Sequence, residues 1–258
     1  MAKFLVGVLT TRDAEKAKRC IDSINSDKVD VVVIVNSPDP DYFKKVEESC
    51  AGYTVIETPC NGTPGKGKNS VLDYFIQKRY DYLLPIDGDD FYTKGAVKQI
   101  VRYVEMLEDV DVLGQLENTM SYRGKETVWK DFSKNMASGT FAAKSRANWR
   151  TIRQFNRLTD EIFPFNRILV LSKYAATNFR YNEEILVADD LLANFVLYAN
   201  TKLKYYLLQN RNWYYYDLTD GGVLQTFATN EANSDNIKPF FDKIKELDFS
   251  ISKATVIE

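Results

Sequence analysis

Hydrophobic and polar positions alternate between two patterns along the first 116 residues, one typical of strands and one typical of helices. A continuous apolar run at Phe4–Leu9 predicts a strand that is buried on both faces. Further runs rich in apolar and β-branched residues predict strands at Val29 with Val31–Val35, at Tyr53–Ile56, at Tyr82–Ile86 and at Val110–Leu116. Between these runs, apolar residues recur at helical spacing, and Asp39-Pro40 is typical of a helix start. Alternating strands and helices predict an α/β fold, with a mostly parallel sheet covered by helices on both faces.

After Leu116 the elements become mixed. Thr119–Trp129 predicts a β-hairpin that turns at Arg123-Gly124. The other predicted elements are a strand at Ile168–Leu171, a helix after Asp189-Asp190, strands at Tyr205–Leu208 and Trp213–Tyr216, and a short helix near Phe240–Leu247. Because no repeat or linker-like segment interrupts the chain, we expect a single domain over residues 1–258.

Composition narrows the functional classes. The chain has 34 Lys or Arg, 36 Asp or Glu and a net charge of −2, which is not typical of a general nucleic-acid binder. It contains no histidine, so a Ser-His-Asp triad, a Cys-His dyad and a histidine zinc site are excluded. Any acid–base chemistry must therefore use carboxylates, lysine, tyrosine or cysteine.

The cysteines and the apolar stretches indicate the compartment. Cys20, Cys50 and Cys60 are odd in number and form no C-x-x-C pair, which favours reduced thiols. No stretch approaches the ~18 continuous apolar residues of a membrane span, and the apolar N-terminal run is too short for a signal peptide. We therefore expect a soluble, cytoplasmic protein.

The most informative motif is Asp87-Gly88-Asp89-Asp90, directly after the predicted strand Tyr82–Ile86. Open α/β sheets bind ligands at the carboxyl ends of their strands. Neighbouring carboxylates repel one another unless a cation shares them, and hard oxygen ligands suit Mg²⁺ or Mn²⁺ together with ligand phosphates. The alternative is a polar turn in which Asp90 caps a helix, but the position at a strand tip favours a functional site.

A second motif, Gly62–Ser70, is a near match to the phosphate-binding P-loop, G-x-x-x-x-G-K-[ST]. Asn69 stands where the magnesium-binding hydroxyl should be, and the segment follows the third predicted strand. A true P-loop is therefore not the preferred interpretation. A loop of glycines and lysines can still surround a pyrophosphate in another fold, and a flexible basic turn is the alternative.

Two further features have open alternatives. Asp189-Asp190 precedes a predicted helix, where adjacent acids are commonly caps that interact well with the helix dipole. The cations of Lys134–Arg157 form either a solvated helical face or a mobile loop that clamps a diphosphate or an anionic acceptor. Trp149, Trp213 and Tyr214–Tyr216 could stack on sugar rings, although core packing is the default explanation.

Together these motifs resemble the GT-A fold glycosyltransferases, above all the inverting family 2, from about Phe4 to Gly222. Lys18–Ile24 looks like the K-R-A-L-D-S-I helix of that family, and Gly65–Asn69 is similar to the end of its G-x-x-x-A-R-N motif. Asp87–Asp90 resembles the D-A-D-D motif of the family. Further along the chain, Phe179–Glu184 resembles its F-D-E motif and Ala188–Leu191 resembles its E-D-L motif. The resemblance implies a GT-A (Rossmann-like) fold.

The resemblance also implies a function. A metal-dependent, inverting enzyme would move a sugar from a nucleotide diphosphate sugar, a UDP-sugar, to an acceptor hydroxyl of a sugar or glycan. About residues 1–116 would bind the donor nucleotide and about residues 117–258 the acceptor. The leaving diphosphate needs positive charge, and the acceptor hydroxyl needs a carboxylate to take its proton.

Site residues follow from the matched positions. Mn²⁺ or Mg²⁺ would be bound by Asp89 and Asp87, with Asp217 in place of the C-terminal histidine that family members often have. Donor contacts are implied for Thr10, Thr11, Arg12, Asn36, Lys68, Asp87 and Gly88. Asp190 would be the catalytic base, while Asp189 would cap the helix or orient acceptor hydroxyls. The rival interpretations are a P-loop-like kinase or NTPase and an inactive carbohydrate-binding relative.

Overall fold

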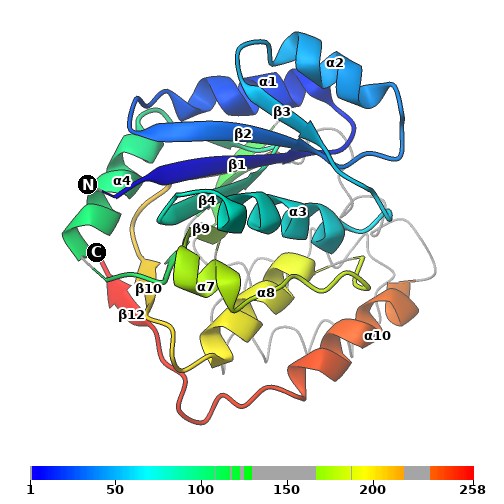
Figure 1. Ribbon diagram of the computed structural model, residues 1–258. Coiled ribbons are helices and arrows are strands. Elements are labelled where there is room, and N and C mark those ends of the chain that lie inside the picture. The colour runs from blue at the N-terminus through cyan, green and yellow to red at the C-terminus, as the bar shows by residue number, and fades with distance from the viewer. Residues whose placement is uncertain are drawn as a thin grey trace.

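The computed structural model describes residues 2–107, 109–116, 118–122, 125–129, 167–186, 188–217 and 233–258. The strands form two sheets, and Figure 1 labels strands of the larger one. The larger sheet contains, from edge to edge, β12 (Thr255–Ile257), β10 (Tyr205–Leu208), β6 (Val112–Gln115), β9 (Arg167–Ser172), β4 (Tyr82–Asp87), β1 (Phe4–Thr10), β2 (Val29–Val35) and β3 (Thr54–Glu57). The smaller sheet contains β5 (Phe91–Tyr92), β11 (Tyr214–Asp217), β7 (Asn118–Tyr122) and β8 (Lys125–Trp129).

The larger sheet is mostly parallel. β1 pairs in parallel with β2 and β4, and β10 pairs in parallel with β6 and β12. β9 is the exception, because it runs antiparallel to both of its neighbours, β4 and β6. The predicted α/β fold with a mostly parallel sheet is therefore confirmed, and so is the predicted hairpin, which β7 and β8 form.

Helices cover both faces of the larger sheet. The helices are α1 (Ala14–Ile24), α2 (Tyr42–Ser49), α3 (Pro64–Gln77), α4 (Ala96–Leu107), α7 (Lys173–Thr177), α8 (Asp189–Ala199) and α10 (Asn233–Ile244). One apolar core joins the sheet to α1, α2 and α4, and a second joins it to α3, α7, α8 and α10. Figure 1 shows α1 and α2 on the side of β1 opposite to α3.

The central strand β1 shows why its sequence is a continuous apolar run. Phe4, Val6 and Val8 belong to the core under α1, whereas Leu5 and Leu9 belong to the core under α3. Since successive side chains of a strand point to opposite faces, a strand between two helical layers needs apolar residues at every position. All seven residues of β1 are buried.

The starts of two helices differ in how they are capped, and one of them was predicted from the sequence. At α1, the Asp13 carboxylate accepts the Lys16 N–H at 2.9 Å, as an N-cap does. The helix predicted to start at Asp39-Pro40 instead begins at Tyr42, and Asp39 forms the turn before it, accepting the Tyr42 N–H at its carbonyl. The predicted basic segment Lys134–Arg157 and Trp149 lie outside the described residues.

Two further sequence expectations concern the state of the cysteines and the presence of membrane-spanning helices. Cys20, Cys50 and Cys60 are free, and the first two are buried. Burial raises the pKa of the Cys20 thiol well above its ordinary value. Within the described part of the chain, none of the helices has the length and apolar character that a membrane span requires.

Candidate active site

The candidate site lies at the sheet edge where β1, β2 and β4 end. Thr10 of β1 is opposite Val35 of β2, and Leu9 of β1 is opposite Asp87 of β4. Because the three strands are parallel, the loops that follow them meet at one edge of the sheet. The predicted motif Asp87–Asp90 therefore occupies the position where α/β sheets bind ligands.

Gly88 allows the tip of β4 to close against β1. Its N–H donates to the Leu9 carbonyl oxygen at 2.6 Å, and a Cβ atom at this position would lie 2.9 Å from the same oxygen. Only glycine permits this approach without a backbone shift. Gly88 thus lets the segment that carries Asp87 and Asp89 pack against the end of β1.

The carboxylates of the motif have different surroundings. Asp90 is fully buried and accepts the Tyr214 hydroxyl at 2.5 Å and the Asp217 N–H at 2.9 Å. It therefore joins β4 to β11, and the alternative of Asp90 as a helix cap is wrong. Asp89 is half-buried, and its carboxylate makes no hydrogen bond or ion pair within the described residues.

Asp87 faces a cavity and lies 3.8 Å from the Lys68 ammonium. Burial raises the pKa of Asp87 to about 7, although the Lys68 charge works in the opposite direction. Its carboxylate is therefore only partly ionised near neutral pH in the ligand-free protein. A cation that arrived at this carboxylate would favour the ionised form.

The segment that resembled a P-loop is helical. α3 begins at Pro64, and the Thr63 hydroxyl caps it by accepting the Lys66 N–H, so Lys68 lies in the second turn. A Cβ at Gly65 would lie 2.0 Å from the Asn182 carbonyl oxygen, so this glycine serves helix packing. The expected glycine-rich loop is absent, and the P-loop interpretation is wrong, because such a loop must wrap phosphates before its helix starts.

Lys68 is the positive centre of the site. Its ammonium donates to Asp189 at 2.7 Å and to Asp190, in addition to its contact with Asp87. It also lies 5.5 Å from the centre of the Tyr181 ring. Burial alone would lower the pKa of Lys68, but the surrounding carboxylates raise it well above its ordinary value. The lysine is therefore charged.

Asp189 and Asp190 occupy the first turn of α8 but differ in their partners. The second oxygen of Asp190 accepts Arg167 at 2.6 Å, so two cations hold its carboxylate. Burial opposes ionisation of Asp190, yet Lys68 and Arg167 lower its pKa to about 2. For Asp189, burial dominates over Lys68 and raises the pKa.

The residue before this acidic pair has an unusual backbone. Ala188 is the N-cap of α8, has no side-chain capping bond and adopts a left-handed conformation with φ 61°. Such a conformation costs alanine of order 1 kcal/mol, and strained residues of this kind cluster at functional sites. Here the strained residue directly precedes the two carboxylates that accept from Lys68.

Arg167 is a site residue that the sequence analysis missed. It is the first residue of β9, and its guanidinium lies 4.2 Å from the centre of the Tyr216 ring and 5.2 Å from that of Tyr214. Because β9 is antiparallel to β4, the start of β9 reaches the edge where β4 ends. The only sequence signal was an arginine directly before an apolar run.

A cavity opens between these charged groups and the sheet. Its polar lining consists of Lys68, Asp87, Arg167, Tyr181, Asp190, Asn194 and Tyr214. Its apolar lining consists of Gly7, Leu9, Val71, Leu72, Leu83, Pro85, Ile86 and Ile168. Asp190 thus faces the cavity, whereas Asp189 does not line it. Such a cavity, with both anionic and cationic walls, can bind a polar ligand and exchange protons with it.

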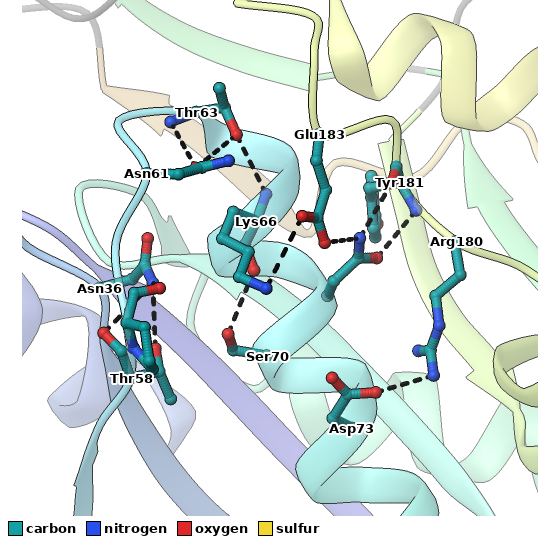
Figure 2. Close-up of polar contacts among 12 residues, drawn as sticks. Asn36, Thr58, Asn61, Thr63, Lys66, Ser70, Asp73, Arg180, Tyr181 and Glu183 are labelled. Carbon is teal, nitrogen blue, oxygen red and sulfur yellow. Dashed lines mark hydrogen bonds and ion pairs between the residues drawn. The ribbon is translucent and has the colours of Figure 1, made fainter.

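The residues expected to contact a nucleotide surround the ends of β1 and β2. Thr10 is buried, and Thr11 and Arg12 are exposed in the loop after it. The side-chain amide of Asn36 donates to Thr58 Oγ1 at 3.0 Å and to the Pro59 carbonyl at 2.9 Å, as Figure 2 shows for Thr58. The structure therefore brings these residues to one edge and uses the Asn36 amide to hold the chain after β3.

Asn69 ties α3 to the segment before α8. Its carboxamide accepts the Tyr181 N–H at 2.9 Å and donates to the Tyr181 carbonyl at 3.0 Å and to Glu183 at 2.8 Å. Figure 2 shows Glu183 also facing Lys66, whose ammonium lies 3.7 Å away. From the sequence, Asn69 had been compared with the P-loop hydroxyl position and with the end of the G-x-x-x-A-R-N motif, and neither comparison predicted this structural role.

The predicted metal ligands fit a divalent ion that binds with phosphate. Asp87 and Asp89 offer hard carboxylate oxygens, which suit Mg²⁺ or Mn²⁺ shared with ligand phosphates. The described residues contain no group of three side chains that could hold a metal without such a ligand. The Asp217 carboxylate lies 2.6 Å from Arg19 and 3.7 Å from Lys16. A metal-bound Asp217 would first have to leave both cations.

Solved structures similar to this chain include several of the S. aureus protein TarS. TarS residues 1–349 in complex with UDP-GlcNAc match with a TM-score of 0.59 and 20% identity, over 95% of this chain and 67% of that one. TarS itself matches with a TM-score of 0.55 and 19% identity, over 97% of this chain and 44% of that one. TarS residues 1–349 in complex with UDP match with a TM-score of 0.53 and 20% identity, over 84% of this chain and 60% of that one.

These structural similarities show the fold. The family is shown by comparison of the sequence with family models. The search of curated proteins found no match. The family model described as glycosyl transferase family 2 matches residues 6–186, which is more than half of the chain and includes most of β1, the tip of β4 and Lys68. This chain therefore belongs to glycosyl transferase family 2.

Proposed function

We propose that this protein is a metal-dependent, inverting glycosyltransferase that moves a hexosyl group from a UDP-sugar to a hydroxyl of a sugar or glycan acceptor. The observation that carries the proposal is the cavity at the strand ends. Carboxylates and cations line it together, and the chain belongs to a glycosyltransferase family. The complex of TarS with UDP-GlcNAc, a protein of similar fold, supports the choice of a uridine nucleotide.

The donor would bind along the edge formed by residues 1–116. Thr10, Thr11, Arg12 and Asn36 would face the nucleoside, and Gly88 would let the donor approach the tip of β4. Asp89, whose carboxylate is unengaged within the described residues, would hold Mn²⁺ or Mg²⁺ with the diphosphate, while Asp87 shares the ion or binds the ribose. The bound ion would supply positive charge to the leaving diphosphate.

Lys68 would supply a second positive charge to the donor. Its ammonium already lies among three carboxylates, so the diphosphate would replace contacts with other anions. A preformed cation in a closed site stabilises the charge that develops on the leaving group. Asp217 stays a prediction as a further metal ligand, and a metal-bound structure would test it.

The acceptor would enter from the half formed by residues 117–258. Asp190 faces the cavity and is ionised, so it can accept a hydrogen bond from the acceptor hydroxyl and then its proton. Attack on the anomeric carbon from the face opposite the diphosphate inverts that centre. Asp189, which does not line the cavity, would keep Lys68 in place or orient acceptor hydroxyls.

The test combines nucleotide release with ligand-dependent melting. A panel of UDP-, GDP- and dTDP-sugars is incubated with the protein and Mn²⁺, with and without excess chelator. We expect release of UDP, loss of activity with chelator, and a melting temperature that rises with UDP only when Mn²⁺ is present. Asp89→Asn should abolish turnover and the metal-dependent rise, whereas Asp27→Asn, at an exposed site outside the cavity, should change neither.

Three outcomes would contradict parts of the proposal. Full activity in excess chelator would exclude the metal dependence. Release of GDP or dTDP in preference to UDP would exclude the assigned donor. Sugar binding without release of any nucleotide would instead support an inactive carbohydrate-binding relative.

A further inference from the structure

The two oxygens of Asp190 are held by different cations. Oδ1 accepts Lys68 from α3, and Oδ2 accepts Arg167 from β9 at 2.6 Å. The carboxylate is therefore fixed from both sides, in a site where it also faces the cavity. The two cations differ in how firmly they are themselves held.

Lys68 is shared and can be redirected. Its ammonium contacts Asp87 and Asp189 as well as Asp190, so no single partner defines its position. A lysine carries a compact charge on a flexible stem, and it can turn toward a new anion by rotation about its side-chain bonds. A diphosphate at the tip of β4 would compete for it.

Arg167 is held in place by its surroundings. The side chain is 9% exposed, and its guanidinium lies over the rings of Tyr216 and Tyr214 at 4.2 and 5.2 Å. Tyr214 is itself anchored, because its hydroxyl donates to the buried Asp90. A planar guanidinium that rests on aromatic rings has little freedom to follow another anion.

We propose that Arg167 is a positioning residue for the transfer reaction: it keeps the Asp190 carboxylate aimed into the cavity when Lys68 turns to the donor diphosphate. This role rests on the proposed function, in which Asp190 accepts the proton of the acceptor. Arg167 also lines the cavity, but in this scheme it affects the reaction through Asp190. It also connects donor binding at β4 to the base, since Asp90 anchors the Tyr214 ring beneath it.

The test is a double-mutant cycle on turnover. UDP release is measured for wild type, Arg167→Met, Asp190→Asn and the double variant, all checked for folding by thermal melting. We expect Arg167→Met to lower kcat at least ~10-fold and to change KM for the donor less than ~3-fold, because donor groups are untouched. In the Asp190→Asn background, Arg167→Met should not lower kcat further, because the effect of Arg167 on turnover passes through Asp190.

Two further variants complete the design. Arg167→Lys keeps the charge without the planar fork and replaces Arg167→Met in the cycle if the latter fails to fold. Arg180→Met is the matched control, because Arg180 forms a half-exposed ion pair with Asp73 at 2.7 Å outside the cavity. This control should keep wild-type kcat and KM.

The outcomes separate this inference from the proposed function. An active wild type whose Arg167 effect is equal in both backgrounds would overturn the positioning role, and so would Arg167 variants with full activity. A wild type that releases no nucleotide from any sugar donor would overturn the proposed function, and the positioning role with it.

Discussion

Asp189 and Asp190 show how two identical neighbouring side chains acquire different chemistry. Both lie in the first turn of α8, but only Asp190 has a second cation and faces the cavity. The pKa of Asp190 is about 2, lowered by Lys68 and Arg167 against the effect of burial, whereas burial raises the pKa of Asp189. A carboxylate of such low basicity takes a proton readily only after one cation has moved away, as Lys68 would on binding a diphosphate.

At this scale we predict unequal effects of two conservative changes. Asp190→Asn keeps the size of the side chain but cannot accept a proton, so transfer should fall by at least ~10² with nearly intact donor affinity. Asp189→Asn should cost less, because this residue does not line the cavity. The measurement is kcat for transfer and the dissociation constant of UDP for each folded variant. A larger loss for Asp189→Asn would reverse the two roles.

Among the elements, α3 and the segment before α8 determine where the charged groups meet. Gly65 lets α3 touch the Asn182 backbone, and Asn69 satisfies both backbone groups of Tyr181. These contacts place Lys68, the residue directly before Asn69, close to the Tyr181 ring and within reach of Asp189. The site is therefore positioned by helix packing and not by a phosphate loop.

At this scale we predict that Asn69→Ala destabilises the fold and disturbs the site. The change leaves the buried N–H and carbonyl of Tyr181 without partners, which should lower the free energy of unfolding by about 2 kcal/mol. Denaturant unfolding measures this loss. Asn178→Ala, which removes an exposed side-chain bond to the Tyr174 carbonyl, is the control and should cost less than about 0.5 kcal/mol. Equal effects would show that Asn69 has no special role.

At the scale of the whole molecule, the buried charged groups of the site lower the stability of the folded state. Asp87, Asp90, Asp189 and Asp190 are close to two cations, Lys68 and Arg167, and burial raises the pKa of all but Asp190. A group whose pKa is higher in the folded than in the unfolded state destabilises the fold increasingly as the pH rises from the unfolded to the folded value. For Asp87 that interval runs from 3.8 to about 7.

We therefore predict that Asp87→Asn stabilises the ligand-free protein while it impairs donor binding. Relative to wild type, the melting temperature of the variant should rise between pH 4 and pH 7 and then stay constant, with a gain of at least ~2 °C at pH 8. Thermal melts at several pH values measure this difference. Asp27→Asn, at an exposed site, should show no such trend. A gain that did not depend on pH would contradict the assigned cause.

Much of the fold was predictable from the sequence because it follows from local patterns. A strand that lies between two helical layers is apolar at most positions, so β1 was visible as a continuous apolar run, and β2 and β4 were visible as mostly apolar runs. The end of β4 marked Asp87–Asp90 as a site, because parallel strands present their carboxyl ends at one edge. The acidic pair at the start of α8 was equally visible, and the family resemblance joined the two motifs.

The rest was decided by contacts between distant segments. Hydrophobic spacing does not record strand direction, so the antiparallel course of β9, which brings Arg167 to the site, was not predictable. A glycine in a sequence indicates that another group can approach the backbone closely, but it does not identify that group. Gly65 therefore looked like part of a phosphate-binding loop, whereas in the structure it packs against the Asn182 backbone. The charge state of Asp190 depends on Lys68 and Arg167 together, and only the folded chain places both cations on one carboxylate.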